Sequence, residues 1–363
     1  MDLRALGWDG RLDLHFTEYA AKGLLPARVT LEHQHIYTVQ TASAEILANV
    51  SGGVRHRASG PQDFPAVGDW VAIKPGGHGR RAVIQAVLPR RSRFSRKVSG
   101  ETTVEQVVAA NVDTVFVVMG LDGDFSLRRV ERYLITAWDG GASPVVLLNK
   151  ADVCEDVAGA LAAVQGVAPG VPVHALSTKY DPDLSCLAPY LLPARTIALL
   201  GSSGVGKSTI VNRLVGHDVQ RTAEVRASDQ KGRHTTSRRQ LIPLPGGALL
   251  IDTPGMRELQ LWEGDAGVAA AFEDIEALAA GCRFGNCRHD TEPGCAVKVA
   301  AEDGRLTADR LASYRELRRE RDALAGRQDE RALIEKKRQG KVMGRAIKAF
   351  HSRGGKNQFD PIV

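Results

Sequence analysis

The feature that most constrains this chain of 363 residues is a complete phosphate-binding loop near its middle. The loop matches the pattern G-x-x-x-x-G-K-[ST], in which backbone N–H groups wrap around phosphate oxygens. An apolar run over residues 196–200 precedes it and a helical pattern over 208–214 follows, as a P-loop requires. We therefore expect a nucleotide to bind the loop and the residue after it, namely Gly201, Ser202, Ser203, Gly204, Val205, Gly206, Lys207, Ser208 and Thr209. Lys207 would contact the outer phosphates, and the Ser208 hydroxyl would bind Mg²⁺.

A second motif selects the base. An N-K-x-D sequence follows another apolar run and consists of Asn149, Lys150, Ala151 and Asp152. The Asp152 carboxylate can accept two hydrogen bonds from the N1–H and N2–H₂ edge of guanine, which adenine lacks. Asn149 would brace the base and its loop, while the Lys150 stem would lie over the ring. A further loop, with Ser177, Thr178 and Lys179, would offer a backbone N–H to the guanine oxygen.

These motifs stand in an inverted order, because the base-reading motif precedes the P-loop. The order indicates a circularly permuted guanine-nucleotide domain. After the P-loop comes a D-x-x-G sequence, in which Asp252 would hold Mg²⁺ through water and the Gly255 N–H would sense the γ-phosphate. Between them lies the expected first switch, where either Thr235 or Thr236 would close on Mg²⁺; their positions do not separate the two.

The residue after the D-x-x-G motif is Met256, where Ras-like GTPases have a glutamine that orients the attacking water. A thioether cannot do this, so we expect slow intrinsic hydrolysis and another group that positions water. His234, in the first switch, is our candidate catalytic residue because imidazole can hold a water near neutral pH. The alternatives are the neighbouring arginines, Arg233, Arg238 and Arg239, or a His234 that is only a surface side chain.

Three of the five cysteines lie within fourteen residues. Together with one histidine they form the set Cys282, Cys287, His289 and Cys295. Three thiolates and an imidazole complete a tetrahedral Zn²⁺ shell and leave no open position, so the pattern predicts one structural zinc ion. The alternative is a group of free thiols, as we expect for Cys154 and Cys186.

Hydrophobic patterning predicts a multidomain α/β protein. Short alternating strands at 28–32, 36–40, 45–50, 69–74 and 81–88 predict an N-terminal β-barrel of the OB type, although an SH3-like barrel has a similar pattern. Apolar strands at 112–119, 144–148, 171–176, 196–200 and 248–251, with a helix at 127–138, predict a covered and largely parallel sheet. A C-terminal helical zinc-binding domain with a long helix near 307–327 follows.

The expected domain organisation has five parts. They are a partly mobile N-terminal lead at 1–27, an RNA-binding barrel at 28–108, the permuted GTPase domain at 109–261, the zinc-binding domain at 262–330 and a basic tail at 331–363. The net charge of +6 is unevenly distributed, since residues 71–100 contain eight Lys or Arg and no acid. Residues 331–356 contain nine against one acid, so we expect a polyanionic partner, or else two solvated charged surfaces.

No stretch of the sequence approaches the length of a membrane span, and the first residues lack the apolar core of a signal peptide. We therefore expect a cytoplasmic protein without membrane contact. Nothing in the sequence indicates an oligomer interface, so we expect a monomer.

Together these motifs resemble the ribosome small-subunit-dependent GTPases, a family of circularly permuted G proteins. The resemblance rests on the motif order, the preceding barrel and the Cys/His cluster, and it covers roughly residues 28–340. It implies GTP hydrolysis to GDP stimulated by the small ribosomal subunit, docking of the barrel and zinc domain on rRNA, and a role in late subunit assembly and rRNA maturation. It also implies a hydrophobic residue in place of the glutamine, which Met256 fits, and a catalytic role for His234.

Two other functions remain open at this stage. One is a nucleotide-gated RNA-binding adaptor in which hydrolysis is incidental. The other is a translation or transport GTPase unrelated to assembly, which fits the nucleotide motifs but not their combination with the barrel and the metal cluster.

Overall fold

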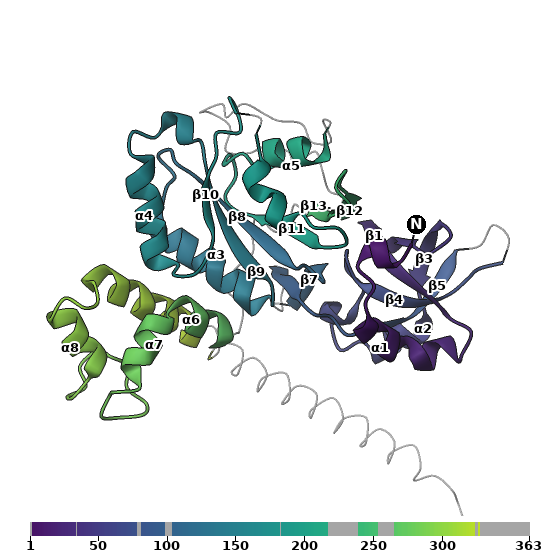
Figure 1. Ribbon diagram of the computed structural model, residues 1–363. Coiled ribbons are helices and arrows are strands. Elements are labelled where there is room, and N and C mark those ends of the chain that lie inside the picture. The colour runs from purple at the N-terminus through teal and green to yellow at the C-terminus, as the bar shows by residue number, and fades with distance from the viewer. Residues whose placement is uncertain are drawn as a thin grey trace, which may run out of the picture.

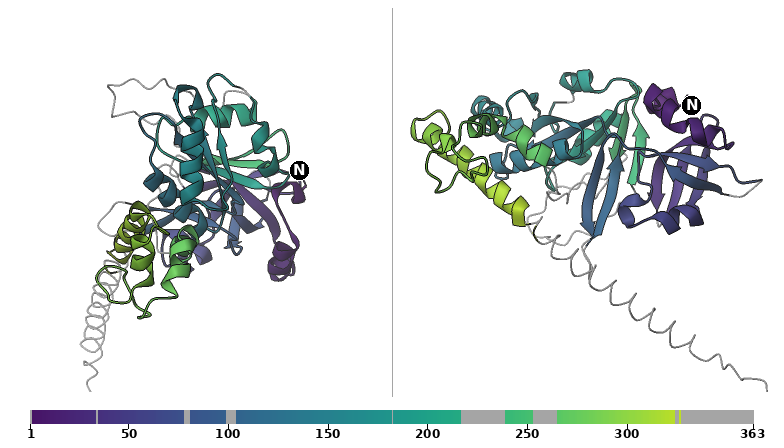
Figure 2. Two further views of the ribbon diagram at one scale, coloured as in Figure 1. Left: turned by 60° about the vertical axis from the view of Figure 1, so that its left-hand side comes forward. Right: turned by 90° about the horizontal axis from the view of Figure 1, so that it is seen from below.

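The computed structural model of the protein describes residues 2–33, 35–77, 81–98, 104–181, 183–216, 239–252, 265–323 and 326. A barrel, an α/β domain and a helical C-terminal subdomain (residues 265–323) follow one another along the chain. Figure 1 shows the barrel and the C-terminal subdomain at opposite ends of the α/β domain. The view from below in Figure 2 shows the same linear order. Within the described residues, no helix is long and apolar enough to cross a membrane.

Five strands form the barrel, in the order β1-β2-β3-β5-β4, and β4 pairs with β1 to close it. The strands are β1 (Leu25–His33), β2 (Ile36–Gln40), β3 (Glu45–Val50), β4 (Trp70–Lys74) and β5 (Ala82–Val87). All neighbours are antiparallel except β3 and β5, and α2 (Gly52–Arg57) and η2 (Pro61–Asp63) lie between strands β3 and β4. Alternate side chains such as Val29, Val39 and Ile84 fill the interior. This closed five-stranded arrangement confirms the predicted OB-type barrel.

The N-terminal residues fold onto the barrel instead of forming the partly mobile lead that the sequence predicted. They form η1 (Arg4–Leu6) and α1 (Gly10–Ala20). Asp9 caps the N-terminus of α1, where its side chain accepts a hydrogen bond from the Leu12 N–H. The Trp8 ring makes edge contacts with the rings of Phe16 and Trp70, with centroids 5.6 and 4.9 Å apart. These large apolar side chains lose water contact only when packed together, and this packing orders the segment.

The α/β domain has parallel strands in the order β10-β9-β8-β11-β13. They are β8 (Thr114–Gly120), β9 (Ser143–Asn149), β10 (Val173–Ala175), β11 (Thr196–Leu200) and β13 (Leu249–Asp252). Side chains of β8 alternate between two cores: Val115 and Val117 belong to the core that includes residues of α3 (Leu127–Asp139) and α4 (Val157–Val167), and Phe116 to the core with α5 (Lys207–Val215). Short turns η3 (Ala151–Val153) and η4 (Ser185–Tyr190) complete the domain. Helices on both faces explain why these strands are almost entirely apolar.

Two features of the sheet were not predicted. Strand β12 (Arg239–Pro243) pairs antiparallel with both β13 and β1, so the α/β sheet continues into the barrel as one sheet, with eleven strands among the described residues. Strands β6 (Arg93–Val98) and β7 (Val104–Ala110) form a separate hairpin between the two domains. The Arg239 guanidinium joins β12 to β1 and to β7. It lies 2.8 Å from the Glu32 carboxylate on β1 and donates a hydrogen bond to Gln106 on β7 at 3.2 Å.

The C-terminal subdomain contains α6 (Asp265–Ala271), α7 (Glu273–Ala279), α8 (Ala296–Glu302) and a helix over residues 308–323. Its core includes Phe272, Ile275 and Tyr314, all fully buried. Ile135 of α3 belongs to the same core, so the subdomain packs directly on the α/β domain.

The junction between the barrel and the α/β domain is built around the buried guanidinium of Arg28 on β1. It donates hydrogen bonds to the Leu6 carbonyl, to the Gly68 carbonyl at 3.2 Å, to the Asn111 carbonyl at 3.4 Å and to the Thr196 hydroxyl at 2.8 Å. Burial lowers its pKa to about 10, so the group is still charged at neutral pH. One side chain thus links the N-terminal segment, the barrel and strand β11.

We predict that Arg28→Lys lowers the free energy of unfolding by about 2–4 kcal/mol, because an ammonium cannot reproduce the guanidinium's fork and leaves buried acceptors unpaired. Urea-induced unfolding followed by tryptophan fluorescence would measure the change. The matched control is Arg57→Lys at an exposed position on α2, which should stay within about 0.5 kcal/mol of the original protein. Equal effects of the two substitutions would contradict this role of Arg28.

Candidate nucleotide and metal sites

The P-loop lies between the end of β11 and the start of α5. The N-cap residue of α5 is Gly206, so no N-cap side chain caps this helix. The N-terminus of a helix carries a partial positive charge, so this position suits a phosphate. Gly201 and Gly206 have φ angles of 152° and 98°, and a Cβ on either would lie 2.2 Å or less from its neighbours. Glycine is therefore required at both positions for the loop to close.

Within the loop the Lys207 ammonium is held close to the backbone. Its Nζ donates to the Gly201 carbonyl at 2.6 Å and to the Ser202 carbonyl. Ser203 and Gly204 are exposed at the tip, while Ser208 and Thr209 are half-buried in the first turn of α5. A phosphate at the loop would meet the Lys207 charge and the N-terminus of α5 together.

Asn149 connects the three predicted nucleotide loops. Its side chain is 2% exposed, and its Nδ2 donates to the Val205 carbonyl of the P-loop at 2.8 Å. Its Oδ1 accepts hydrogen bonds from the Thr178 backbone N–H at 3.1 Å and hydroxyl at 3.0 Å. The structure thus brings the N-K-x-D motif, the 177–179 loop and the P-loop together at the carboxyl ends of parallel strands, where ligands bind in open α/β sheets.

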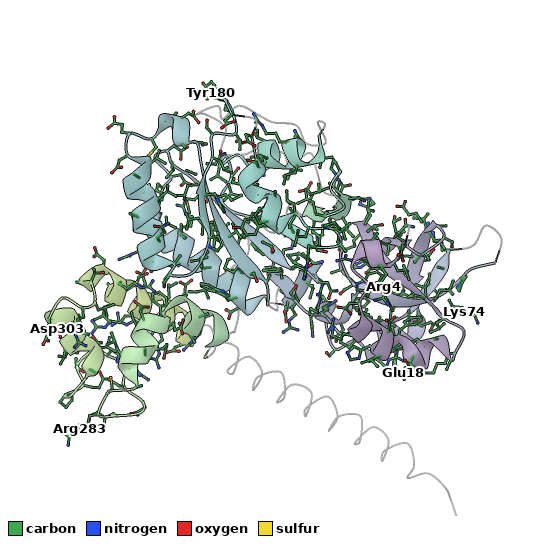
Figure 3. All side chains as sticks on the ribbon, in the orientation of Figure 1. Arg4, Glu18, Lys74, Tyr180, Arg283 and Asp303 are labelled. Atoms are coloured by element: carbon green, nitrogen blue, oxygen red, sulfur yellow. The ribbon has the colours of Figure 1, made fainter. Side chains whose placement is uncertain are left out.

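The base-reading side chains lie at the rim of this site. Asp152 is exposed, and the Ser177 hydroxyl donates to its Oδ1 at 2.6 Å, which fixes the carboxylate. Ala151 lies beside it in η3, and the Lys179 ammonium lies 5.2 Å from the centroid of the Tyr180 ring. Figure 3 shows Tyr180 at the outer edge of the α/β domain, where its side chain is exposed.

One member of the site was missed by sequence reasoning. The Asp122 carboxylate lies 2.5 Å from the Lys150 ammonium, and Lys150 itself has a left-handed φ of 65°. Burial opposes ionisation of Asp122, but the hydrogen bond from Lys150 prevails and lowers the pKa of Asp122 below its usual value. Asp122 follows β8 by two residues, so the rule that ligands gather at strand ends contained the signal for it.

The remaining nucleotide predictions fall at the two switches. Asp252 ends β13, whose neighbour β11 leads into the P-loop, so its place suits a magnesium-side carboxylate. His234, Thr235, Thr236 and Gly255, like Arg233, Arg238 and Met256, lie outside the described residues. Arg239, an alternative to His234, is bound to Glu32 and Gln106 on the barrel and hairpin.

The four predicted metal ligands converge in the C-terminal subdomain. The ligand atoms of Cys282, Cys287, His289 and Cys295 all lie within 4.8 Å of one another. The Cys282 and Cys295 Sγ atoms are 3.9 Å apart, and the His289 Nδ1 lies 3.6 and 3.4 Å from them. A tetrahedral ion with bonds of about 2.3 Å to sulfur and 2.0–2.1 Å to nitrogen requires separations of about 3.8 and 3.6 Å. The cluster therefore fits a metal ion.

Three of the four ligands are buried, and Cys282 is half-buried. Cys287, His289 and Cys295 are buried, and burial raises the pKa of the Cys287 thiol to about 11. Cys295 also caps α8 by accepting a hydrogen bond from the Lys298 N–H. Cys154 and Cys186 lie elsewhere, as predicted, and are half-buried.

Comparison with known proteins agrees with this geometry. The model of the RsgA GTPase family matches residues 87–262. A protein of Opitutus terrae named small ribosomal subunit biogenesis GTPase RsgA is 49% identical over 91% of this chain and 92% of its own length. The chain belongs to the RsgA GTPase family. An RsgA of Syntrophotalea carbinolica, with the same name, is 41% identical over 99% of this chain and 100% of its own.

Solved structures of similar proteins support the RsgA fold. YjeQ from Thermotoga maritima superposes with a TM-score of 0.62 at 25% identity, covering 82% of this chain and 98% of its own. YloQ, described as a circularly permuted GTPase, superposes with a TM-score of 0.59 at 23% identity, covering 83% of this chain and 96% of its own. The predicted family, fold class and GTPase activity are confirmed.

We predict that Asn149→Ala weakens GDP binding about 5- to 150-fold, because the buried partners it leaves unpaired cost about 1–3 kcal/mol. Titration with a fluorescent GDP analogue would measure the affinity. The matched control is Gln165→Ala, which removes an exposed amide on α4 and should leave binding unchanged. Unchanged binding in Asn149→Ala would contradict the bridging role.

The cluster geometry predicts one tightly bound divalent metal ion per chain, measurable by mass spectrometry of the purified protein. Cys287→Ser should lose the ion and unfold the C-terminal subdomain, since such sites contribute folding energy directly. Cys186→Ser, a thiol outside the cluster, should keep it. A full metal content in Cys287→Ser would refute the assignment.

Proposed function

We propose that this protein hydrolyses GTP to GDP and phosphate in biogenesis of the small ribosomal subunit, stimulated by that subunit. The observation that carries the proposal is the meeting of P-loop, N-K-x-D motif and 177–179 loop around the Asn149 side chain. Relatives named small ribosomal subunit biogenesis GTPase that align over almost the whole chain supply the biological role. We propose further that it acts late in subunit assembly, during rRNA maturation, as the resemblance of its motifs implies.

For the chemistry, we propose Ser208 and Asp252 as the residues that hold Mg²⁺, which neutralises charge on the outer phosphates. Lys207 and the N-terminal N–H groups of α5 bind and orient those phosphates. We propose His234 as the residue that positions the attacking water, Thr235 or Thr236 as the switch threonine, and the Gly255 N–H as the γ-phosphate sensor. Their places in the sequence support these roles.

For the partner, we propose that the barrel and the C-terminal subdomain bind rRNA of the small subunit. The uneven distribution of basic residues along the sequence supports this, because Lys and Arg contact RNA phosphates. On the hairpin next to the barrel, the Arg93 side chain is about half exposed and Arg96 is half-buried. The metal is proposed to be zinc, because a closed set of three thiolates and one imidazole suits it. We propose the domain limits 28–108, 109–261 and 262–330, flanked by 1–27 and 331–363, and a monomer in the cytoplasm.

The test is GTP turnover with and without purified small ribosomal subunits at near-physiological salt. We expect stimulation of at least about tenfold by small subunits and none by large ones, as for switch GTPases that wait for a partner. His234→Ala should lose the stimulation while keeping GDP affinity. His56→Ala, an exposed histidine on α2, is the matched control and should behave like the original protein.

Absence of stimulation with intact subunit binding would favour the nucleotide-gated RNA-binding adaptor. Full stimulation in His234→Ala would remove His234 from the chemistry without affecting the assignment of the substrate. The first outcome therefore tests the proposed GTPase function, and the second tests only the role of His234.

A further inference from the structure

Helix α3 lies between the P-loop and the C-terminal subdomain. Figure 1 shows it beside the strands of the sheet, with α6 of the subdomain against it. The helix contributes side chains to both neighbours from different faces. Its contacts therefore determine whether the two ends of the molecule move independently.

One face of α3 contacts Ser202, the second residue of the P-loop. The Ser202 hydroxyl lies 3.2 Å from the Arg129 Nη1 and 3.2 Å from the Tyr133 hydroxyl. Arg129 and Tyr133 are four residues apart and so lie one above the other on the helix. Arg129 is held in turn by the Asp124 carboxylate at 2.5 Å.

The other face of α3 is fixed to the C-terminal subdomain. The Glu131 carboxylate, 2% exposed, lies 2.6 Å from the Arg310 guanidinium and accepts a hydrogen bond from the Ser313 hydroxyl. Further along, Arg132 pairs with Glu320 at 2.8 Å. These partners all belong to the helix over 308–323, so two helices from different parts of the chain are joined along their length.

Arg310 extends this connection into the subdomain. Its guanidinium also pairs with Asp274 at 2.9 Å, donates to the Ala271 carbonyl at 2.6 Å and lies 4.3 Å from the centroid of the Phe272 ring. Such a buried and fully bonded ion pair resists separation, because either charge left alone would be desolvated without a partner. Helix α3 and the subdomain are therefore joined by a buried ion pair as well as by a shared apolar core.

Helix α3 also reaches the phosphate-binding groups. Ser202 offers its hydroxyl to α3 and its carbonyl to the Lys207 ammonium. A shift of α3 would move Ser202 and with it the acceptor that holds Lys207. The buried Glu131–Arg310 pair is therefore connected to Lys207, which would contact phosphate, through α3 and Ser202.

We infer that α3 couples the C-terminal subdomain to the P-loop, with Tyr133, Arg129 and Glu131 as positioning residues for nucleotide binding. The coupling is reciprocal, as linkage requires: nucleotide at the P-loop stabilises the helix over 308–323, and disturbing the Glu131 contact weakens nucleotide binding. The inference rests on the proposed binding of guanine nucleotide at the P-loop. It adds a route by which a partner held by the subdomain changes the nucleotide site.

The test combines GDP affinity with hydrogen exchange of residues 308–323, measured on the full chain. In the original protein, we expect GDP to slow exchange in this helix. Tyr133→Phe keeps the ring and removes only the hydroxyl, and Ser202→Ala removes its partner. Each should weaken GDP binding about fivefold, the low end of measured coupling, and should reduce the effect of GDP on exchange in 308–323.

Glu131→Gln tests the opposite direction, because its carboxylate is bound by Arg310 and Ser313, which belong to the C-terminal subdomain. It should weaken GDP binding by a similar factor. The matched control is Glu316→Gln, which disrupts the exposed Arg128–Glu316 pair on the same two helices and should change neither readout. If Glu131→Gln does not fold, Tyr133→Phe and Ser202→Ala still decide the question.

Two results would overturn the inference: GDP binds the original protein without slowing exchange in 308–323, or the slowing persists at full size in both Tyr133→Phe and Ser202→Ala. A protein that binds no GDP at all would instead refute the nucleotide site itself. The failure of the coupling and the failure of the proposed function thus give different observations.

Discussion

The buried Arg28 guanidinium is the interaction on which the arrangement of the N-terminal half depends. Its donors reach Leu6, Gly68, Asn111 and Thr196, which belong to segments far apart in the chain. A buried cation is stable only when its donors are occupied, so each of these segments must be in place for the others to pack. The hydrogen bonds of this buried cation therefore hold the barrel on the α/β domain, in addition to the apolar contacts between them. The ring of Trp70, whose centroid lies 5.4 Å from the guanidinium, adds a cation–π contact at the same point.

Much of the architecture could be predicted because its signals are local. Strands β2, β3 and β11 begin and end at the predicted residues, since alternation or continuous burial marks them clearly. Strand β12 and the β6–β7 hairpin escaped prediction because their polar side chains, such as Arg239 and Gln106, are satisfied by partners distant in sequence. Apolar periodicity carries no information about such pairing. The N-terminal helix was missed for a related reason, because what orders it is contact with Trp70.

The candidate sites also contain residues that the local sequence reveals and residues that depend on distant contacts. The P-loop, the N-K-x-D motif and the cysteine cluster could be found because their chemistry needs particular residues at short spacing. Arg129 and Tyr133 could not, because their importance arises from contacts with Ser202 that only the fold creates. Asp122 was marked only by its place just after β8, and its contact with Lys150 appears only in the fold. A metal ion held by the four ligands would also stabilise the small helical subdomain, because joining them would compensate for a limited apolar core.

The pairing of β12 with β1 has a consequence for any attempt to dissect this protein. A shortened chain that began near Asn111 would keep β12 at the margin of the sheet but remove the strand that covers it. The backbone N–H and C=O groups of β12 that now face Leu31 and Glu32 would become an open edge able to recruit a strand from another copy. Such a fragment should self-associate in size-exclusion chromatography, whereas a soluble monomeric fragment would show that the edge is protected in another way. The barrel thus also shields the edge of the α/β sheet from other chains.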